Sequence, residues 1–327
     1  MMKRRHFSQA MAAGLLAPMA TLPSLASAKP YAGTVRVLVG FPPGGATDII
    51  ARALVDRLGQ VPGAQTFIID NKPGAGGQIA AQFLKSAPAD GSTIMLSIDH
   101  TQVIIPLTIA AANYNAVTDF TPIVGVARYY NVLAVSASTG IKTMDELGMW
   151  LKAHPNDANL GIPAAGSVPQ FIGHIVGKSF GVTMNPIPYK GGAPMVQDLL
   201  AGQVPMAIAS MTELIEYHRN GKVRILASSG DVRSKAGPEI PTFKELGFSG
   251  IDNPWVAFFG PKDMPADVVQ PYAQAVKAVL QQPDLQERLA KMGNEVAPAP
   301  SPEVRQWVAD GTLHWGQVIR ESGFKPL

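Results

Sequence analysis

The stretch TVRVLVGFPPGGATD, residues 34–48, joins a run of β-branched residues to a glycine-rich loop and the start of a helix. Residues 34–40 are predicted to form a buried strand, because valine recurs through the run and a glycine ends it. The loop then leads into a helix that keeps its apolar side chains on one face and ends at Gly59. Asp48 falls in the first turn of that helix, where the helix dipole favours an anion.

The alternation of strand and helix continues beyond this stretch. Strands are predicted at 65–70 and 93–98, with a helix between them that starts at the glycines of 74–77. This βαβαβ order implies a parallel sheet covered on both faces, and therefore an α/β fold. A second α/β series follows, with predicted strands at 131–135, 160–163, 186–189, 205–209 and 223–227 and helices at 144–152, 168–180, 194–201 and 212–218.

The pattern changes after the apolar strand predicted at 255–259. Three successive helices are expected from there, starting at Pro265, Pro283 and Ser301. This helical tail packs either on the second α/β series or back on the first, and spacing alone leaves both arrangements open.

Composition excludes several classes of protein. The chain has 327 residues, 27 Lys and Arg against 24 Asp and Glu, and no cysteine. It therefore has no disulfide scaffold, cysteine-ligated metal, thiol catalysis or lipidated N-terminal cysteine.

Residues 1–28 are predicted to be a signal peptide. Lys3, Arg4 and Arg5 precede a mildly apolar run that ends in the small residues of 26–28. The arginine pair resembles a twin-arginine signal, and the general secretory route stays open. Removing this leader leaves equal numbers of basic and acidic residues, so we expect an exported, neutral, soluble monomer of the periplasm that does not bind nucleic acid.

Two glycine loops, 41–48 and 71–77, each follow a strand and open a helix. Glycine lets backbone approach a ligand closely, and the free N–H groups of a helix N-terminus favour an anion. Such loops meet at the carboxyl ends of parallel strands, where ligands bind. The pattern predicts backbone capture of an anion, although glycines in tight turns explain either loop alone.

The second series carries two comparable loops. In loop 163–168, Ser167 either caps the following helix or hydrogen-bonds a ligand. Tyr189 and Lys190 precede another helix, where they either donate to a ligand or form a solvated turn. Loops of two units that face each other describe a cleft able to close on a small ligand.

Enzyme signatures are weak in comparison. Residues 165–169 depart from the Gly-x-Ser-x-Gly nucleophile elbow at the last position, and residues 74–80 resemble a dinucleotide loop only loosely. The histidines include no metal-binding pair, and nothing brings acids such as Asp99 and Glu213 together. We therefore expect no cofactor, no metal site and no catalysis, and keep an exported hydrolase that uses Ser167 as an alternative.

These loops, in this order, resemble the Bug family, the TctC-like periplasmic solute-binding proteins of tripartite tricarboxylate transporters. The resemblance covers essentially the whole chain after the leader. The motifs that carry it are Phe41–Arg52, Asp70–Gly77, Pro188–Pro194, Asp198–Val204, Pro241–Phe248 and Trp255–Pro265.

The resemblance implies a two-domain Venus-flytrap fold that holds a small carboxylate between its domains. It assigns the C-terminal helices to the first domain, giving residues 29–130 plus 255–327 as domain 1 and 131–254 as domain 2. Carried over to this chain, the ligand-binding positions are Phe41, Gly44, Gly45 and Ala46 of the first loop, Thr101 after the third strand, and Ala165, Gly166, Ser167 and Tyr189 of the facing domain. Asp48 and Asp99 of this sequence are added as candidate ligand-binding residues beside them.

The sequence departs from the family pattern in two places. Gln170 stands where the family often has histidine, and Asp99 and His100 stand where small neutral residues are usual. A carboxylate in the cleft would repel a plain dicarboxylate, so a ligand with an amine, hydroxyl or amide is implied if Asp99 faces it. The equal alternative is that the Asp99 side chain turns away from the cleft or pairs with another group of the protein.

The resemblance and the loops together predict a receptor that captures a small organic acid and delivers it to membrane transport subunits. A ligand sensor for a membrane signalling partner shares the fold and is the other alternative. The sequence leaves the ligand unnamed.

Overall fold

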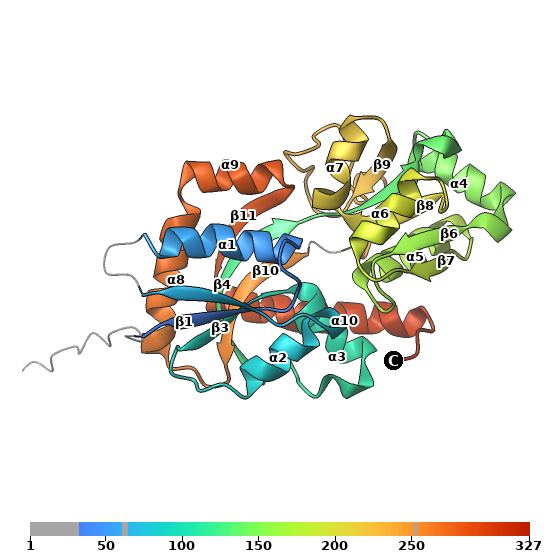
Figure 1. Ribbon diagram of the computed structural model, residues 1–327. Helices are drawn as coiled ribbons and strands as arrows, with labels where there is room; N and C mark the ends of the chain where they lie inside the picture. The colour runs from blue at the N-terminus through green and yellow to red at the C-terminus, as the bar shows by residue number, and fades with distance from the viewer. Residues whose placement is uncertain (1–32, 61–64, 252–253) are drawn as a thin grey trace, which may run out of the picture.

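The computed structural model describes residues 33–60, 65–251 and 254–327, arranged as two lobes that each contain one β-sheet (Figure 1). The predicted signal peptide lies outside these described residues. In the described part of the chain, no helix combines the length and the apolar character needed to cross a bilayer.

The first sheet has six strands in the order β11-β4-β10-β3-β1-β2. Its strands are β1 (Val35–Val39), β2 (Phe67–Asn71), β3 (Thr93–Ile98), β4 (Phe120–Tyr129), β10 (Trp255–Pro261) and β11 (Asn294–Pro300). β1 pairs in parallel with both β2 and β3, which confirms the parallel arrangement predicted for the first three strands. β10 runs antiparallel to β3 and β4, and β11 runs antiparallel to β4, so the sheet as a whole is mixed.

The second sheet has five strands in the order β7-β6-β8-β5-β9. Its strands are β5 (Asn131–Ser136), β6 (Asn159–Ile162), β7 (Asn185–Pro188), β8 (Met206–Ser210) and β9 (Val223–Ser228). β6 pairs in parallel with β7 and β8, whereas β5 pairs antiparallel with β8 and β9. Each strand lies within a residue or two of its predicted position.

The predicted helices occur in the predicted order, and α3 is an additional helix that was not predicted. They are α1 (Ala46–Leu58), α2 (Gln78–Lys85), α3 (Ile105–Thr108), α4 (Met144–Ala153), α5 (Val168–Phe180), α6 (Gly192–Leu200), α7 (Met211–Arg219), α8 (Ala266–Leu280), α9 (Pro283–Lys291) and α10 (Ser301–Glu321). Short helical turns occur at Ala75–Gly77, His100–Ile104, Ala110–Ala112, Ala137–Thr139 and Pro155–Asp157, the second of them π-helical.

Two strands were not expected. The prediction of three successive C-terminal helices is wrong, because β11 lies between α9 and α10. β11 holds Pro298 and Pro300, which suit an edge strand because proline has no N–H to donate. β4 contains Pro122 and Gly125, residues that are unfavourable in strands, and for that reason it was not predicted from the sequence. It nevertheless lies inside the sheet.

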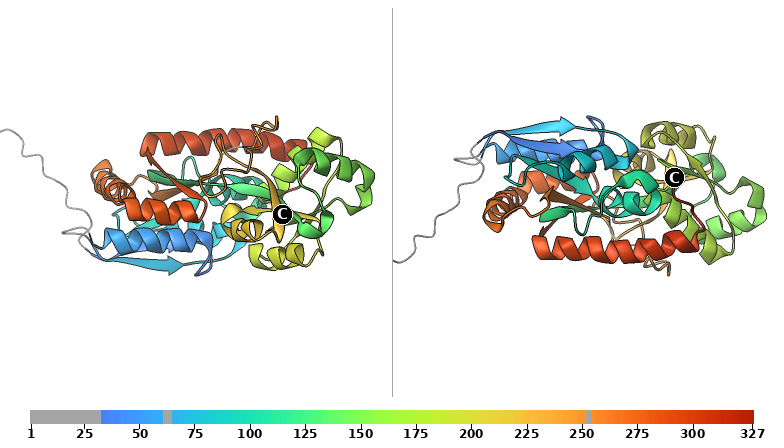
Figure 2. Two further views of the ribbon diagram at one scale, coloured as in Figure 1. Left: turned by 90° about the horizontal axis from the view of Figure 1, so that it is seen from above. Right: turned by 90° about the horizontal axis from the view of Figure 1, so that it is seen from below.

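The C-terminal helices return to the first sheet. α8 and α10 pack on β4, and α8 also contacts α1. The chain crosses from the first sheet to the second between β4 and β5 at Tyr130, and it returns to the first sheet with β10. Figure 2 shows α10 running along the first lobe and reaching the helices of the second.

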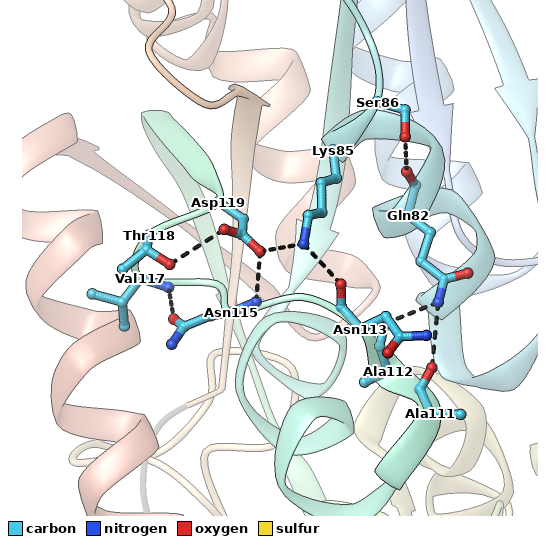
Figure 3. A network of polar contacts seen from close by, with 10 residues as sticks. All are labelled: Gln82, Lys85, Ser86, Ala111, Ala112, Asn113, Asn115, Val117, Thr118 and Asp119. Carbon is cyan, nitrogen blue, oxygen red and sulfur yellow. Dashed lines mark hydrogen bonds and ion pairs between the residues drawn. The ribbon is translucent and has the colours of Figure 1, made fainter.

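A network of polar contacts fixes the long connection between α3 and β4 against α2 (Figure 3). The Lys85 ammonium pairs with Asp119 at 2.8 Å and donates to the Asn113 carbonyl at 2.9 Å, while Gln82 donates to the Ala112 carbonyl at 2.9 Å. Burial alone would raise the pKa of Asp119, but hydrogen bonds led by that from Lys85 outweigh it and lower the pKa. The connection therefore holds a defined path although it contains little regular structure.

Candidate functional site

A cavity of about 410 Å³ lies between the two lobes. The first lobe lines it with Phe41, Pro42 and residues 45–47 of the first loop, with Gly76 and with His100. The second lobe lines it with residues 163–164 and 167–169, with the glycines 191–192 and with Ser210 and Glu213. We call this space the cleft cavity.

Four helix N-termini meet at the cleft cavity. Gly45, Ser167, Gly191 and Ser210 are the residues that precede α1, α5, α6 and α7, and all four line it. Each helix start leaves backbone N–H groups without an intrahelical partner and carries partial positive charge. Helix starts from both lobes therefore line the cavity, and such starts suit an anion. Of the two glycine loops singled out in the sequence, the first contributes the start of α1, and the second contributes Gly76 but not the start of α2.

Asp48 supports the first glycine loop through hydrogen bonds to its buried side chain. Its side chain is fully buried and does not line the cavity; it accepts a hydrogen bond from the Gly44 N–H at 2.8 Å. The guanidinium of Arg52 and the amide of Asn71 also donate to it, each at 2.8 Å at closest. Burial alone would raise the pKa of the Asp48 carboxyl, but these hydrogen bonds, led by that from Arg52, outweigh it and lower the pKa.

The loop that Asp48 organises contributes several residues to the lining of the cleft cavity. Phe41, Gly45 and Ala46 line the cavity together with the buried Thr47. Gly44 does not line it; its φ of 80° is in the left-handed region that favours glycine, and it turns the chain towards α1.

Thr101 performs a similar supporting role for the second glycine loop. Its side chain is fully buried, its hydroxyl donates to the Gly76 carbonyl at 2.8 Å, and it does not line the cavity. Gly76 itself does line the cavity, beside the imidazole of His100. Burial lowers the pKa of His100 to about 4, so the ring is neutral at neutral pH.

Asp99 turns away from the cleft cavity. It is 5% exposed, it accepts a hydrogen bond from the Tyr129 hydroxyl at 2.6 Å, and it lines a separate cavity of about 240 Å³ beside Arg128 and Trp307. The sequence left two orientations of Asp99 open, and the structure shows the one in which the side chain is paired and does not line the cleft cavity. The argument that Asp99 repels a dicarboxylate therefore does not apply.

Ser167 is the predicted residue whose hydroxyl is most clearly available. It precedes α5 and lines the cleft cavity, and it is 3% exposed with no hydrogen-bond partner for its Oγ atom. Its side chain does not cap the helix, although spacing favoured that alternative. Separately, the side chain of Gln170 accepts a hydrogen bond from the Gly166 N–H, just before the helix, at 2.8 Å. Gln170 therefore braces the loop and does not line the cavity.

The remaining predicted positions in the second lobe do not line the cleft cavity. Ala165 is exposed, and Gly166 is buried against Phe324 and Thr108. Tyr189 donates its hydroxyl to Asp198 at 2.7 Å, and burial with that contact raises its pKa to about 12.

Sequence reasoning missed several residues that do line the cavity. They are His100, Tyr129, Asn131, Ser210, Glu213 and Asn294. Glu213 had a sequence signal, since Ser210 followed three residues later by Glu213 matches a capping box after a strand. Asn294 had none, because the strand that it begins was not predicted. Asp99 and Glu213 are not brought together, and no cluster of side chains able to hold a metal ion occurs in the described ranges.

Comparisons with known proteins agree with this architecture. The model of the tripartite tricarboxylate transporter family receptor, TctC, matches residues 50–324. Protein BugT of Bordetella pertussis is 31% identical over 316 residues, 96% of this chain and 94% of that protein.

Three solved structures share the fold and cover most of their own length. The Rhodopseudomonas palustris protein Rpa4515 with adipate superposes with a TM-score of 0.82 at 29% identity, over 90% of this chain and 98% of that one. The periplasmic binding protein BugD gives 0.79 at 28%, over 90% and 99%. MatC of Rhodopseudomonas palustris with bound malate gives 0.75 at 27%, over 88% and 98%. The chain therefore belongs to the TctC family, the Bug-type periplasmic solute-binding receptors of tripartite tricarboxylate transporters, which are binding proteins and not enzymes.

Proposed function

We propose that this receptor binds a small carboxylate in the cleft cavity. The observation that carries the proposal is the meeting of four helix N-termini with the unpartnered hydroxyl of Ser167. Backbone N–H groups at helix starts suit a carboxylate, and a buried hydroxyl without a partner gains a hydrogen bond when one arrives. Adipate and malate in two structural relatives are carboxylates of the expected size class.

Among the predicted site residues, we assign direct contact with the ligand to Phe41, Gly45, Ala46 and Ser167. We assign loop support to Gly44, Asp48, Thr101 and Gly166, whose hydrogen bonds or packing hold the lining segments in place. Asp99, Ala165 and Tyr189 receive no ligand contact in this proposal.

The two lobes would close on the ligand as two domains, 29–130 plus 255–327 and 131–254. The separate sheets and the packing of α8 and α10 on β4 support this division. The leader would direct export, and the released monomer would deliver its ligand to the membrane subunits of a tripartite transporter. A cysteine-linked lipid anchor is not part of the proposal, since the sequence contains no cysteine.

A thermal-shift screen of organic acids, amino acids and aromatic carboxylates tests the proposal. An acid present at a hundredfold excess over its Kd should raise the free energy of unfolding by about 2.7 kcal/mol. The screen would contradict carboxylate binding if no acid stabilised the protein.

Substitution of Ser167 locates the site. Ser167→Ala should leave the stability of the unliganded protein unchanged, because the hydroxyl makes no hydrogen bond there. It should weaken binding of the acid found in the screen roughly three- to tenfold, the size of one lost hydrogen bond. Ser179→Ala, at an exposed serine of the same helix, is the matched control and should bind normally. Unchanged affinity in Ser167→Ala would remove Ser167 from the site.

A further inference from the structure

Glu213 stands apart from the other groups around the cleft cavity. Within the described part of the chain it is the one charged side chain that lines the cavity, which holds no lysine or arginine. The polar residues beside it are neutral, and they include Thr47, Asn131 and Ser210. The cavity therefore combines anion-binding helix starts with a single carboxylate.

The position of Glu213 is fixed by its surroundings. It lies in the first turn of α7, where its carboxylate accepts a hydrogen bond from the backbone N–H of Ser210. Its carboxylate also lies against Gly192 at the start of α6, where an added Cβ would collide with it. The carboxylate is thus held at one place on the wall of the cavity and is not free to swing into solvent.

The charge of Glu213 is compensated only in part. No ion pair joins it to any of the described residues, and its surroundings supply one backbone donor and the weak positive charge of helix starts. Burial raises the pKa of this carboxyl. A partly buried carboxylate without a cation carries a desolvation cost that a cationic partner relieves.

We propose that the ligand carries a protonated amine in addition to its carboxylate, and that Glu213 binds the amine. This inference rests on the proposed function, since it places the carboxylate at the helix starts and adds a second contact. The sequence suggested an amine-bearing ligand because Asp99 was expected in the cleft. This proposal keeps that ligand class and assigns recognition of the amine to Glu213. A plain dicarboxylate would instead bring a second negative charge towards Glu213.

Matched pairs of acids test the inference by calorimetry. Glutamate against glutarate, aspartate against succinate, and 4-aminobutyrate against butyrate differ within each pair by the amine. The wild-type protein should bind the amine-bearing member of at least one pair tenfold or more tightly than its partner. Equal or tighter binding of the members without an amine would overturn the assignment.

Glu213→Gln removes the charge and keeps the shape. Glutamine serves as well as glutamate in a capping box, so α7 keeps its N-terminal hydrogen bond and the variant should fold. It should lose at least tenfold in affinity for the amine-bearing acid and bind the other member of the pair no more weakly than the wild type does. Retention of the wild-type preference by Glu213→Gln would also overturn the assignment.

A matched control and the wider screen separate this inference from the proposed function. Glu216→Gln changes an exposed carboxylate on the same helix and should keep the wild-type preference. If acids without an amine bind and Glu213→Gln has no effect, carboxylate binding stands and the role of Glu213 falls. If no carboxylic acid of either kind binds, both fall.

Discussion

Asp48 supports the site through the loop that it holds. Its two oxygens accept four hydrogen bonds, from the Gly44 N–H, twice from the Arg52 guanidinium and from the Asn71 amide. Asn71 also donates to the Phe41 carbonyl at 3.0 Å, so the same contacts join the ends of β1 and β2. The carboxylate thereby sets the conformation in which Gly45 and Ala46 face the cleft cavity.

Replacement of Asp48 tests this supporting role. Asp48→Asn should lower the free energy of unfolding by about 2–3 kcal/mol, because an amide cannot accept from all of these donors at a buried position. It should also weaken ligand binding roughly tenfold by loosening the loop. Urea unfolding and calorimetry measure the two effects.

Asp56→Asn is the control for this substitution, since Asp56 is exposed on the same helix. It should change neither quantity. A stable Asp48→Asn protein with unaltered affinity would show that the loop keeps its shape without the carboxylate.

At this scale the sequence predicted which loops form the site but not the direction of each side chain. Asp48, Asp99 and Tyr189 were all expected at the ligand, and all three direct their polar atoms to partners within the protein. Arg52 lies four residues after Asp48, the spacing at which side chains on a helix meet, so that partner follows from the sequence. The partners of Asp99 and Tyr189 lie 30 and 9 residues away, and no spacing rule identifies them. Spacing favoured Ser167 as a side-chain cap of α5, yet its hydroxyl makes no capping contact and lines the cleft cavity without a hydrogen-bond partner.

The glycine loops act through close contact between elements. Gly40 follows β1, and a Cβ added there would lie 2.6 Å from the backbone Cα atom of Gly77 at the end of the second loop. Backbone cannot move aside as a flexible side chain can, so the first sheet and the second loop need glycine at this contact.

Substitution at Gly40 measures the importance of that contact. Gly40→Ala should destabilise the protein by about 1–3 kcal/mol through overpacking. It should also weaken ligand binding, because Gly76 in the displaced loop lines the cleft cavity. Thermal unfolding and calorimetry check both results.

Gly59→Ala provides the comparison, since Gly59 ends α1 in a right-handed conformation and an added Cβ would meet only ordinary contacts. It should be neutral or stabilising by about 0.4–1 kcal/mol. Equal stabilities for the two variants would mean that β1 and the second loop separate at little cost.

Elements with strong periodicity were predicted well, and irregular ones were not. β3 and α5 have the predicted bounds, because β-branched runs and apolar stripes determine them locally. β4 and β11 contain proline or glycine, and their strand conformation depends on pairing with β10 and with each other. Such pairing joins residues far apart in the chain and leaves little local pattern.

At the scale of the whole molecule, the two lobes share one hydrophobic cluster. It extends from Leu38 and Met95 of the first sheet to Leu133 and Leu160 of the second. The sequence left two positions open for the C-terminal helices. The structure shows α10 on β4 of the first sheet, with Trp315 near Phe171 of α5 in the second lobe.

The segment after α10 links this contact to the ligand site. The Phe324 ring meets Phe171 edge to face with centroids 5.6 Å apart, and it lies against Gly166 in the loop that carries Ser167. Lys178 of α5 pairs with Glu321 at 3.1 Å nearby. The position of the α5 N-terminus therefore depends on packing against the end of α10.

Phe324→Ala should reveal this dependence. Loss of a partly buried aromatic ring should lower the free energy of unfolding by about 2–3 kcal/mol, less than for a fully buried phenylalanine because the ring is partly exposed. Ligand affinity should fall several-fold, since Gly166 and Ser167 lose the surface that supports them. Leu313→Ala, at a side chain 75% exposed on α10, should change neither property. Urea unfolding and calorimetry measure the stability and the ligand affinity of both variants. If Phe324→Ala behaves like Leu313→Ala in both measurements, the Ser167 loop is held in place by its own lobe alone.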